Sequence, residues 1–259
     1  MSTLNEQGPL PEYLSASSIS TFQQCPLKFK FSRIDKISEP PTMQTLMGNF
    51  VHEVLETMYK DFPLEERKLT LAKEICGELW VSGEWEEKVR PYLGAVKLNE
   101  FRWMSWWCVE NLFQLEDPTT ITPSGVEHEL NTDLDGVRIK GFIDRWNEEN
   151  GIAKITDYKT GKTPNPRFSA SKFFQLTLYA AALARDYDFK GYELELLYLK
   201  DGIRLTNTPK PSEIQAAVDT VVQVREEIEK SYENNKWETI PTKLCDWCIF
   251  KKSICTYWN

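Results

Sequence analysis

The chain has 259 residues, of which 41% are hydrophobic and 27% charged, and its formal net charge is −8. These values exclude a disordered chain, a collagen-like chain and a small disulfide scaffold, and there is no run of about 18 apolar residues that could span a membrane. Residues 1–11 carry neither the basic nor the apolar part of a secretory signal. We therefore expect an intracellular protein whose six cysteines are thiols or metal ligands.

The first half of the chain has the apolar spacing of helices. A short helix is expected to begin near Ser15 and to end near Arg33, and Glu39-Pro40-Pro41 then breaks the chain. Further helices are predicted over residues 44–59, 64–90 and 91–115. The last of these ranges contains Trp103, Trp106 and Trp107. Aromatic residues at helical spacing are more typical of a packed core, although exposed rings can also stack single-stranded bases.

The second half of the chain changes to the period of strands after Pro123-Ser124-Gly125. Alternating residues predict strands over residues 126–130, 137–146, 152–158 and 192–199. Asn150-Gly151 lies between the second and third strands and is a hairpin signal. Helices are predicted over residues 169–184 and from a capping box of Ser212 and Gln215 to about Asn234. This order of elements predicts an α/β fold with a mixed central sheet flanked by helices.

Basic residues gather in three segments of this acidic chain. Residues 25–36, 154–172 and 243–259 carry net charges of +3, +4 and +2, so the remainder sums to −17. If the three segments meet in space, they form a positive groove that could bind nucleic acid. Taken alone, the charges favour the simpler interpretation of a solvated surface.

Two carboxylates and a lysine are placed to meet in the predicted sheet. If the strands on either side of Asn150-Gly151 pair, Asp144 and Asp157 approach each other, and Lys159 shares a strand face with Asp157. Two close carboxylates repel each other unless a cation lies between them, and oxygen ligands suit Mg²⁺ or Mn²⁺. The lysine could polarise a phosphate or position a water. A salt bridge between strands is the alternative, and these three residues alone favour it.

The residues around this constellation carry further motifs. Gly141-Phe142-Ile143-Asp144-Arg145 precedes Asp157-Tyr158-Lys159, and the whole resembles the nuclease core of the PD-(D/E)XK superfamily, in particular its RecB-like branch. Gly48 and His52 resemble the G-x-x-x-H helix of that branch, and Gln175 with Tyr179 resembles its Q-x-x-x-Y motif. Glu127 resembles the acidic residue of the preceding strand, although Glu129 could fill that place. The resemblance covers roughly residues 14–60 and 125–259.

The resemblance implies a restriction-endonuclease-like core within a single nuclease domain, 1–259. Its expected parts are N-terminal helices (14–60), a helical insertion (61–118), the nuclease core (125–235) and a cysteine-bearing C-terminal loop (241–259). The implied activity is metal-dependent exonuclease cleavage of DNA. His52, Asp144, Asp157 and the carbonyl of Tyr158 are then expected to hold Mg²⁺ or Mn²⁺.

The resemblance also gives roles to the residues around the expected metal. Lys159 would stabilise negative charge or align the attacking water, and Glu127 is the weaker carboxylate candidate. Gln175 and Tyr179, one helical turn apart, would hold the nucleic-acid backbone or orient Lys159. His52 lies off the apolar stripe of its own helix, which favours a role as a ligand over a place in the core.

Four cysteines form a second candidate site. Cys245, Cys248 and Cys255 lie within eleven residues, while Cys25 stands far upstream. Four thiolates suit either tetrahedral Zn²⁺ or a [4Fe–4S] cluster. The arrangement resembles the iron–sulfur staple of AddB-type and CRISPR-adaptation nucleases, which implies [4Fe–4S] here with Zn²⁺ as the alternative. Cys76 and Cys108, among apolar helical residues, are expected to be buried.

The expected partner is DNA, with single-stranded ends, and no membrane. A helicase, a recombination complex or a second copy of the chain are the other partners considered. No GxxxxGK[ST] motif is present, so the chain is not itself expected to be a helicase motor. The alternative function is a DNA-binding or adaptor subunit of a recombination or CRISPR-adaptation complex with secondary or lost nuclease activity. The expected location is the cytoplasm of a bacterium or of a phage-infected host.

Overall fold

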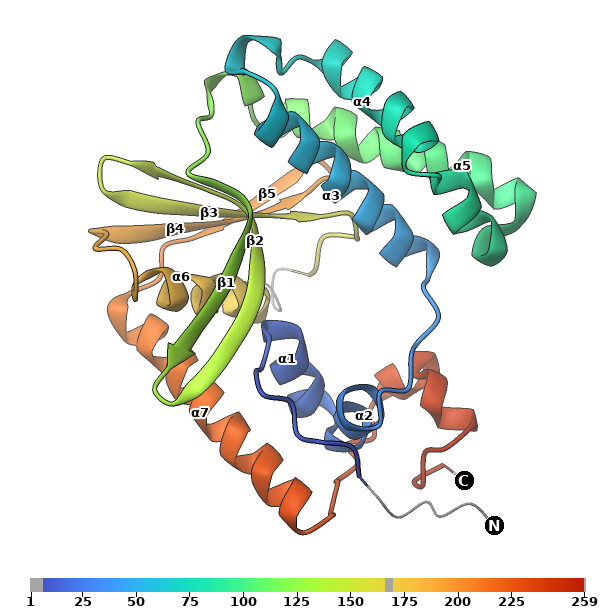
Figure 1. The fold of residues 1–259 in the computed structure, drawn as a ribbon, viewed down its shortest axis with the longest axis vertical. Helices are drawn as coiled ribbons and strands as arrows, with labels where there is room; N and C mark the ends of the chain where they lie inside the picture. Colours follow the sequence, from blue (N-terminus) through green and yellow to red (C-terminus); the bar gives the residue numbers. More distant parts are fainter. Residues whose placement is uncertain (1–6, 166–169, 259) are drawn as a thin grey trace.

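A five-stranded mixed sheet forms the centre of the protein in a computed structural model that describes residues 7–165 and 170–258 (Figure 1). The strands are β1 (Gly125–Leu134), β2 (Val137–Glu149), β3 (Ile152–Lys159), β4 (Gly191–Tyr198) and β5 (Ile203–Asn207). They lie in chain order across the sheet. The β3–β4 pair is parallel and the other pairs are antiparallel. The predicted α/β fold with a mixed sheet is therefore confirmed.

Two tight turns set the register of the first three strands. Asn150 and Gly151 have φ of 56° and 85°, as a two-residue turn of type I′ requires, which confirms the predicted hairpin. Asp135 and Gly136 make the same kind of turn between β1 and β2, with φ of 52° and 90°. Their Asp-Gly signal was available in the sequence but did not enter the prediction. The edge strand β5 was also missed, because its residues are half-buried or exposed and lack clear alternation.

Seven α-helices surround the sheet in the described residues. They are α1 (Ala16–Gln24), α2 (Pro26–Phe29), α3 (Met43–Asp61), α4 (Leu69–Ser82), α5 (Trp85–Leu115), α6 (Phe174–Leu183) and α7 (Pro211–Glu233). The side chain of Ser15 caps α1, as predicted. Helix α7 instead begins after Lys210, whose backbone N–H donates to Glu213, and Pro211 takes the first helical position. The predicted capping box of Ser212 and Gln215 was therefore wrong by two residues.

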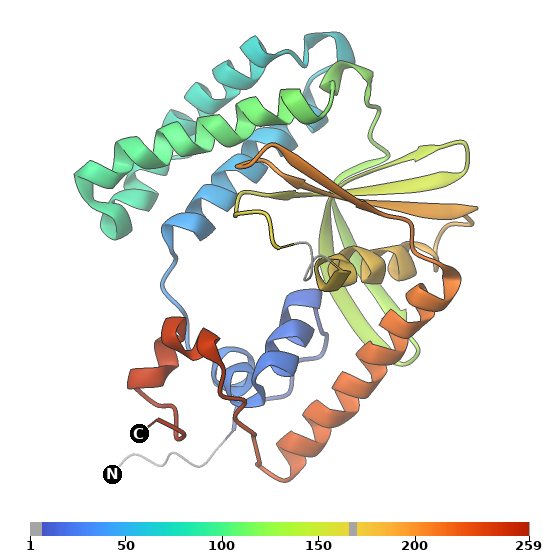
Figure 2. The ribbon, with the colours of Figure 1, turned by 180° about the vertical axis from the view of Figure 1, so that it is seen from behind.

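The helices form two groups on opposite sides of the sheet. Helices α3, α4 and α5 pack together on one side of the sheet. They bury Tyr158 of β3, Leu197 of β4 and Leu199, which directly follows β4. Helices α1, α6 and α7 pack over the ends of β1 and β2 around Leu134, Val137 and Ile139, among others. Figures 1 and 2 show α4 and α5 at the end of the molecule farthest from α1, α2 and the C-terminus. Helix α3 thus lies between the sheet and the α4–α5 pair.

The break between α4 and α5 differs from the prediction. The two helices were expected to meet at Pro91, but α4 ends at Ser82 and Glu84 takes a left-handed φ of 52°. Buried Trp85 and Val89 hold the first turns of α5, which contain Pro91, and the helical dihedrals are interrupted three residues later at Gly94, with φ of 67° and ψ of 171°. The break expected at Pro91 is therefore found at Gly94, and a second break at residues 83–84 separates α4 from α5.

Trp103, Trp106 and Trp107 of α5 do not share one environment. Trp106 packs against the core formed by α3, α4 and α5, as predicted. Trp103 is 62% exposed and Trp107 is 41% exposed, so the prediction of a core position was wrong for these two. Trp106 and Trp107 are neighbours in the sequence, and the period of a helix places neighbours on different faces. A cluster of tryptophans therefore does not show by itself which ring lies on the core face.

The two ends of the described chain lie side by side. The backbone N–H of Leu27 in α2 donates to the carbonyl of Glu238 at 3.0 Å, and the rings of Phe31 and Phe250 lie 5.1 Å apart. Figure 2 shows the C-terminal segment beside α2. This segment contains only two short 3₁₀ turns, Lys243–Trp247 and Ile249–Lys252, in accord with the predicted loop. In the described residues, no helix is both long and apolar enough to cross a bilayer.

Candidate active site

Three side chains from three elements meet where α3 crosses the sheet. His52 of α3, Glu127 of β1 and Asp144 of β2 place one potential ligand atom each within 4.8 Å of the others. The Nδ1 atom of His52 lies 3.5 Å from an oxygen of Asp144 and 3.9 Å from an oxygen of Glu127. Asp144 has only 11% of its side chain exposed, so the group is open to solvent mainly through His52 and Glu127. One nitrogen and two carboxylates are a donor set that binds divalent cations.

The register of β1 and β2 explains why Glu127 reaches this group. Val126 pairs with Arg145 and His128 with Ile143, so Glu127 lies opposite Asp144. Glu127 has a left-handed φ of 44°, which interrupts the extended strand at this residue. Glu129, the alternative candidate, instead lies 2.8 Å from the ammonium of Lys140. The structure therefore brings Glu127, and not Glu129, to His52.

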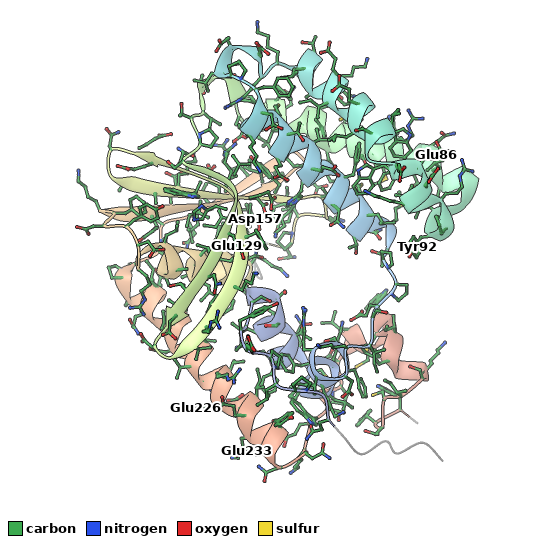
Figure 3. The ribbon with its side chains drawn as sticks, in the orientation of Figure 1. Glu86, Tyr92, Glu129, Asp157, Glu226 and Glu233 are labelled. Carbon is green, nitrogen blue, oxygen red and sulfur yellow. The ribbon has the colours of Figure 1, made fainter. Side chains whose placement is uncertain are left out.

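The end of β3 completes the site from the other side. The backbone N–H of Tyr158 donates to Asp144 at 2.7 Å, and its carbonyl lies 2.9 Å from Nε2 of His52. Asp157 is buried, and its carboxylate lies 2.6 Å from Nζ of Lys159. Figure 3 shows Asp157 where the sheet meets α3. The carboxylate of Asp157 is not part of the compact group of three, so the Asp157–Lys159 pair lies beside that group.

Crowded charges in the site shift the pKa values of its groups. Burial, together with the charge of Asp144, raises the pKa of Asp157 to about 6, against the opposing effects of Lys159 and His52. Burial would lower the pKa of His52, but the hydrogen-bonding carboxylates of Asp144 and Glu127 raise it to about 11. The negative charge of the carboxylates therefore dominates the site and favours the protonated forms of His52 and Asp157. A divalent ion would bind there by displacing these protons.

The site lies in a cleft of about 660 Å³ between α3 and the end of β3. Gly48, His52 and Glu56, one turn apart from each other, line the helical wall, and Lys159 and Thr160 line the opposite wall. A Cβ atom on Gly48 would lie 3.5 Å from the hydroxyl oxygen of Thr160, which is an ordinary contact. Thr160 directly follows the Asp-Tyr-Lys motif in the sequence, which assigned it no role.

Gln175 and Tyr179 lie together on α6, below the sheet. The amide of Gln175 donates to the hydroxyl oxygen of Tyr179 at 3.0 Å. The Tyr179 ring lies so close to β2 that a Cβ atom on Gly141 would be 2.9 Å from it, which explains the glycine that opens this motif. Burial raises the pKa of Tyr179 to about 12, and the charges of Asp157 and Asp144 add to the shift. The pair is thus within electrostatic reach of the carboxylates, but it does not line the cleft.

A buried ion pair fixes the strand that carries Asp144. Arg145 has no exposed surface, and its guanidinium donates to both carboxylate oxygens of Glu116, at 2.5 and 2.8 Å. Glu116 follows the last residue of α5, and the guanidinium also lies 4.6 Å from the centre of the Tyr59 ring. Arg145 is the last residue of the Gly141–Arg145 motif in the sequence. The partners of Arg145 come from distant segments, which local spacing does not reveal.

The four cysteines of the second candidate site line one pocket, which we call the cysteine pocket. Cys25, Cys245, Cys248 and Cys255 surround a space of about 230 Å³ beside Lys28 and Lys251. All four are partly exposed. Cys76 and Cys108 lie apart from them in α4 and α5, half-buried and buried respectively, and burial raises the pKa of each thiol to about 12. The structure therefore brings together the four cysteines that the sequence grouped.

The basic segments carry much of their charge in local ion pairs. Lys30 pairs with Asp35, Lys154 with buried Glu195, and Lys251 with Asp246, at 2.7, 3.1 and 2.7 Å. Lys159 faces the cleft and Lys28 faces the cysteine pocket. Arg167, counted in the central segment, lies outside the described residues. Lys28 and Lys159 are themselves paired, with Glu39 at 3.5 Å and Asp157 at 2.6 Å, so at least five of the cations counted in the three segments have a carboxylate partner.

Comparison with known proteins identifies relatives of this chain. It is 26% identical to the Gene 69 protein of Mycobacterium phage L5, over 90% of this chain and 93% of that protein. It is 27% identical to the Gene 69 protein of Mycobacterium phage D29, over 67% of this chain and 69% of that protein. A crystal structure of a candidate exonuclease from Eubacterium rectale has a similar fold, with a TM-score of 0.60 at 14% identity, covering 94% of this chain and 90% of that one.

The family assignment follows from the length of chain that one family profile matches. The profile of the PD-(D/E)XK nuclease superfamily matches residues 13–256, which include the cleft, the Gln175–Tyr179 pair and all four cysteines of the pocket. A divalent metal and a DNA substrate are what that superfamily implies, and the compact group around His52 fits such a metal. This chain belongs to the PD-(D/E)XK nuclease superfamily.

Proposed function

We propose that this protein is a RecB-like DNA exonuclease that uses Mg²⁺ or Mn²⁺ and carries a [4Fe–4S] cluster. The observation that carries the proposal is the meeting of His52, Glu127 and Asp144 at the wall of the cleft, which His52, Glu127 and Lys159 line, with the Asp157–Lys159 pair beside them. A surface salt bridge between strands, the alternative interpretation, does not account for a histidine and a second carboxylate from two further elements.

Each residue of the cleft has a role that its position supports. His52, Asp144, Asp157 and the carbonyl of Tyr158 would hold the metal, with Glu127 as a further carboxylate on the open side of the group. A bound divalent ion supplies an acidified water and neutralises charge on the phosphate. Lys159, whose ammonium is held by Asp157, would bind a phosphate oxygen as negative charge develops there.

Gln175 and Tyr179 have a supporting role in this proposal. Their hydrogen bond fixes the Tyr179 ring against Gly141 of β2. Gly141 lies three residues before Asp144 on the same strand. The pair would then maintain the position of β2, and with it the metal ligand, rather than contact Lys159. This role differs from the two expected from the resemblance, in which Gln175 and Tyr179 hold the DNA backbone or orient Lys159.

The cysteine pocket supports an iron–sulfur cluster better than a single zinc ion. Four thiolates around one zinc at Zn–S of about 2.3 Å would bring all sulfurs within about 4 Å of each other. Among the described residues, the groups with ligand atoms within 4.8 Å of each other do not include three of these thiols. A [4Fe–4S] cluster takes one thiolate on each of four irons and so accepts wider spacing. The apolar rings of Trp247 and Trp258 beside the pocket would shield such a cluster.

The segments of the chain are proposed to act as one nuclease domain. Residues 14–60 supply Cys25 and His52, residues 61–118 form the helical insertion, and residues 125–235 form the sheet and its helices. Residues 241–259 supply the other three thiols. The buried Arg145–Glu116 pair joins the insertion to the sheet, which favours one unit over two. A bacterial cytoplasm or a phage-infected host is the proposed location.

Digestion of end-labelled DNA tests the proposed activity. Purified protein with Mg²⁺ or Mn²⁺ should shorten linear single- or double-stranded DNA from its ends and leave covalently closed circles intact. Cleavage of the closed circles would show that the activity is that of an endonuclease and not of an exonuclease. Absence of any cleavage, by protein that retains its metal and its fold, would favour the adaptor subunit of a recombination or CRISPR-adaptation complex. Partners such as a helicase or a second copy would then be sought by co-purification.

A further inference from the structure

A groove between α4 and α5 lies away from both candidate sites. Its volume is about 540 Å³, and Phe50 of α3 contributes to its lining. Trp80 of α4 and Trp103 and Trp106 of α5 line it as well. Phe50 and His52 are two residues apart and therefore lie on opposite sides of α3. The groove is thus separated from the active-site cleft by the thickness of that helix. We refer to it as the α4–α5 groove.

The charge of the α4–α5 groove is opposite to that of the whole chain. Lys73 and Arg102 line it and no carboxylate does, although the net charge of the protein is −8. Neither cation forms an ion pair within the part of the chain that the structure describes. The guanidinium of Arg102 lies 4.9 Å from the centre of the Trp80 ring, so it is positioned without being neutralised. This pattern is complementary to an anion with aromatic parts.

Trp103 is held in place with much of its surface in solvent. Its ring stacks on that of Trp107 at 5.7 Å with an angle of 17° between the planes, and it is 62% exposed. The indole N–H of Trp107 donates to the carbonyl of Lys200, in the turn between β4 and β5. A large exposed ring that is fixed from behind is a preformed platform, because little conformational freedom remains to be lost when a ligand stacks on it.

We propose that the α4–α5 groove is a second binding site for single-stranded DNA, with a base stacked on Trp103 and adjacent phosphates bound by Lys73 and Arg102. Aromatic platforms beside cations are the features that bind single strands without sequence preference. The inference rests on the proposed function, since the bound strand is the substrate class of the cleft. It adds an anchoring site on the far side of α3, at which no bond is broken.

Removing the Trp103 ring is the direct test. Binding of a fluorescent oligo(dT) strand is measured by anisotropy in EDTA, so that no cleavage occurs. Loss of one stacked base should weaken affinity about five- to a hundred-fold in Trp103→Ala. Tyr187→Ala is the matched control, because Tyr187 is 41% exposed and also stacks on a neighbouring ring, Phe189, at 17°. The control should bind like the unmodified protein, and both variants should keep its melting temperature.

A negative charge placed at Gly77 tests whether the cations of the α4–α5 groove bind phosphates. Gly77 belongs to α4 and lines the groove. A Cβ atom there would meet no atom within 4 Å, so a longer side chain can be accommodated. Gly77→Glu and Gly77→Gln have the same size and differ only in charge. The glutamate should weaken oligo(dT) binding several-fold more than the glutamine, and the difference should shrink as salt is raised because phosphate contacts are screened.

The outcomes separate this inference from the proposed function. Hydrolysis of bis(p-nitrophenyl) phosphate, too small to span both sites, should be unchanged in Trp103→Ala. If the unmodified protein cleaves neither this ester nor DNA, the proposed function fails. If it cleaves DNA while Trp103→Ala and Gly77→Glu bind oligo(dT) like their controls, the inference is overturned. A change in oligomeric state in Trp103→Ala, at unchanged DNA affinity, would also overturn it and assign the α4–α5 groove to a second copy of the chain.

Discussion

The side chains of the active site come from α3 and from three adjacent strands, all backed by buried core. The thiols of the cysteine pocket come instead from the junction of α1 and α2 and from a distant C-terminal segment with short 3₁₀ turns. Among the described residues, the buried cluster around the pocket comprises only Leu27, Phe31 and Phe250. The sheet therefore positions the cleft before any ion binds. The pocket has much less packing of its own, and a bound cluster would supply much of its rigidity. The comparison teaches that the two sites should respond differently to loss of their metals.

The largest expected effect is on catalysis in the cleft. Asp144→Asn, Asp157→Asn and Lys159→Ala should each reduce DNA cleavage by at least about 10³-fold, because each removes a charge that acts on the metal or the phosphate. Their melting temperatures should stay within a few degrees of the unmodified value, since the core positions the cleft. Rates on end-labelled DNA and thermal melts give both readouts. Turnover near that of the unmodified protein in any one variant would remove that residue from the active site.

The opposite behaviour is expected of the cysteine pocket. Cys25→Ala or Cys248→Ala should lose iron and the broad absorption near about 400 nm, and should lose several kcal/mol of stability because metal binding couples to folding. Cys76→Ala and Cys108→Ala are the controls and should keep their iron. The measurements are metal content, the absorption spectrum and thermal melts of protein purified without oxygen. A colourless protein with one zinc per chain would show that zinc, and not a cluster, occupies the cysteine pocket. A stable, active protein without metal would contradict a metal site in this pocket.

The buried pair beside the cleft sharpens the comparison. Arg145→Met should destabilise the protein by about 3–5 kcal/mol, because it leaves the buried carboxylate of Glu116 with the Tyr59 hydroxyl but without a cation. Arg185→Met is the matched control. Its pair with Asp135 has 44% and 49% of the side chains exposed, and its loss should cost less than about 1 kcal/mol. Urea unfolding measures both changes. Equal effects would show that the Arg145 pair does not hold β2 in place.

The smallest effect is expected at the two cysteines outside the pocket. Burial raises the pKa of the Cys76 and Cys108 thiols to about 12, so at pH 8 only about one in 10⁴ is the reactive thiolate. Iodoacetamide should leave both unmodified in the folded protein at pH 8. Labelling should rise about tenfold per pH unit as long as the fold persists. Peptide mass spectrometry locates the labelled residues, and rapid labelling of Cys108 at pH 8 would contradict its buried position.

Local signals in the sequence predicted the parts of the molecule that local physics determines. Asn150-Gly151 predicted a hairpin whose register places Asp144 near Asp157, and the pairing of Arg145 with Thr156 agrees with it. Ser15 correctly marked the start of α1. The sequence did not predict how α3 docks on the sheet, so it could not show that His52 contacts the carbonyl of Tyr158. It placed the histidine at the site only through the spacing of its motif.

The remaining differences have tertiary causes. The helical segment that contains Pro91 continues to Gly94, and Trp85 and Val89 anchor its first turns in the core. The exposed position of Trp103 depends on which face of α5 meets α3, and aromatic residues occur on both the buried and the exposed faces of this helix. The partners of Arg145 lie on α3 and after α5, far away in sequence. These features arise from contacts between distant segments, which periodicity and spacing do not encode.

The meeting of the two chain ends also sets an order of events during synthesis. Cys25 and Leu27 leave the ribosome early, while Glu238, Phe250 and the other three thiols of the cysteine pocket follow more than two hundred residues later. At about 5–20 residues per second, the early segment waits on the order of 10 to 45 s for its partners. Cluster insertion would then come after translation of the sheet, and a chain that stalls before Cys245 would expose α2 to chaperones and proteases.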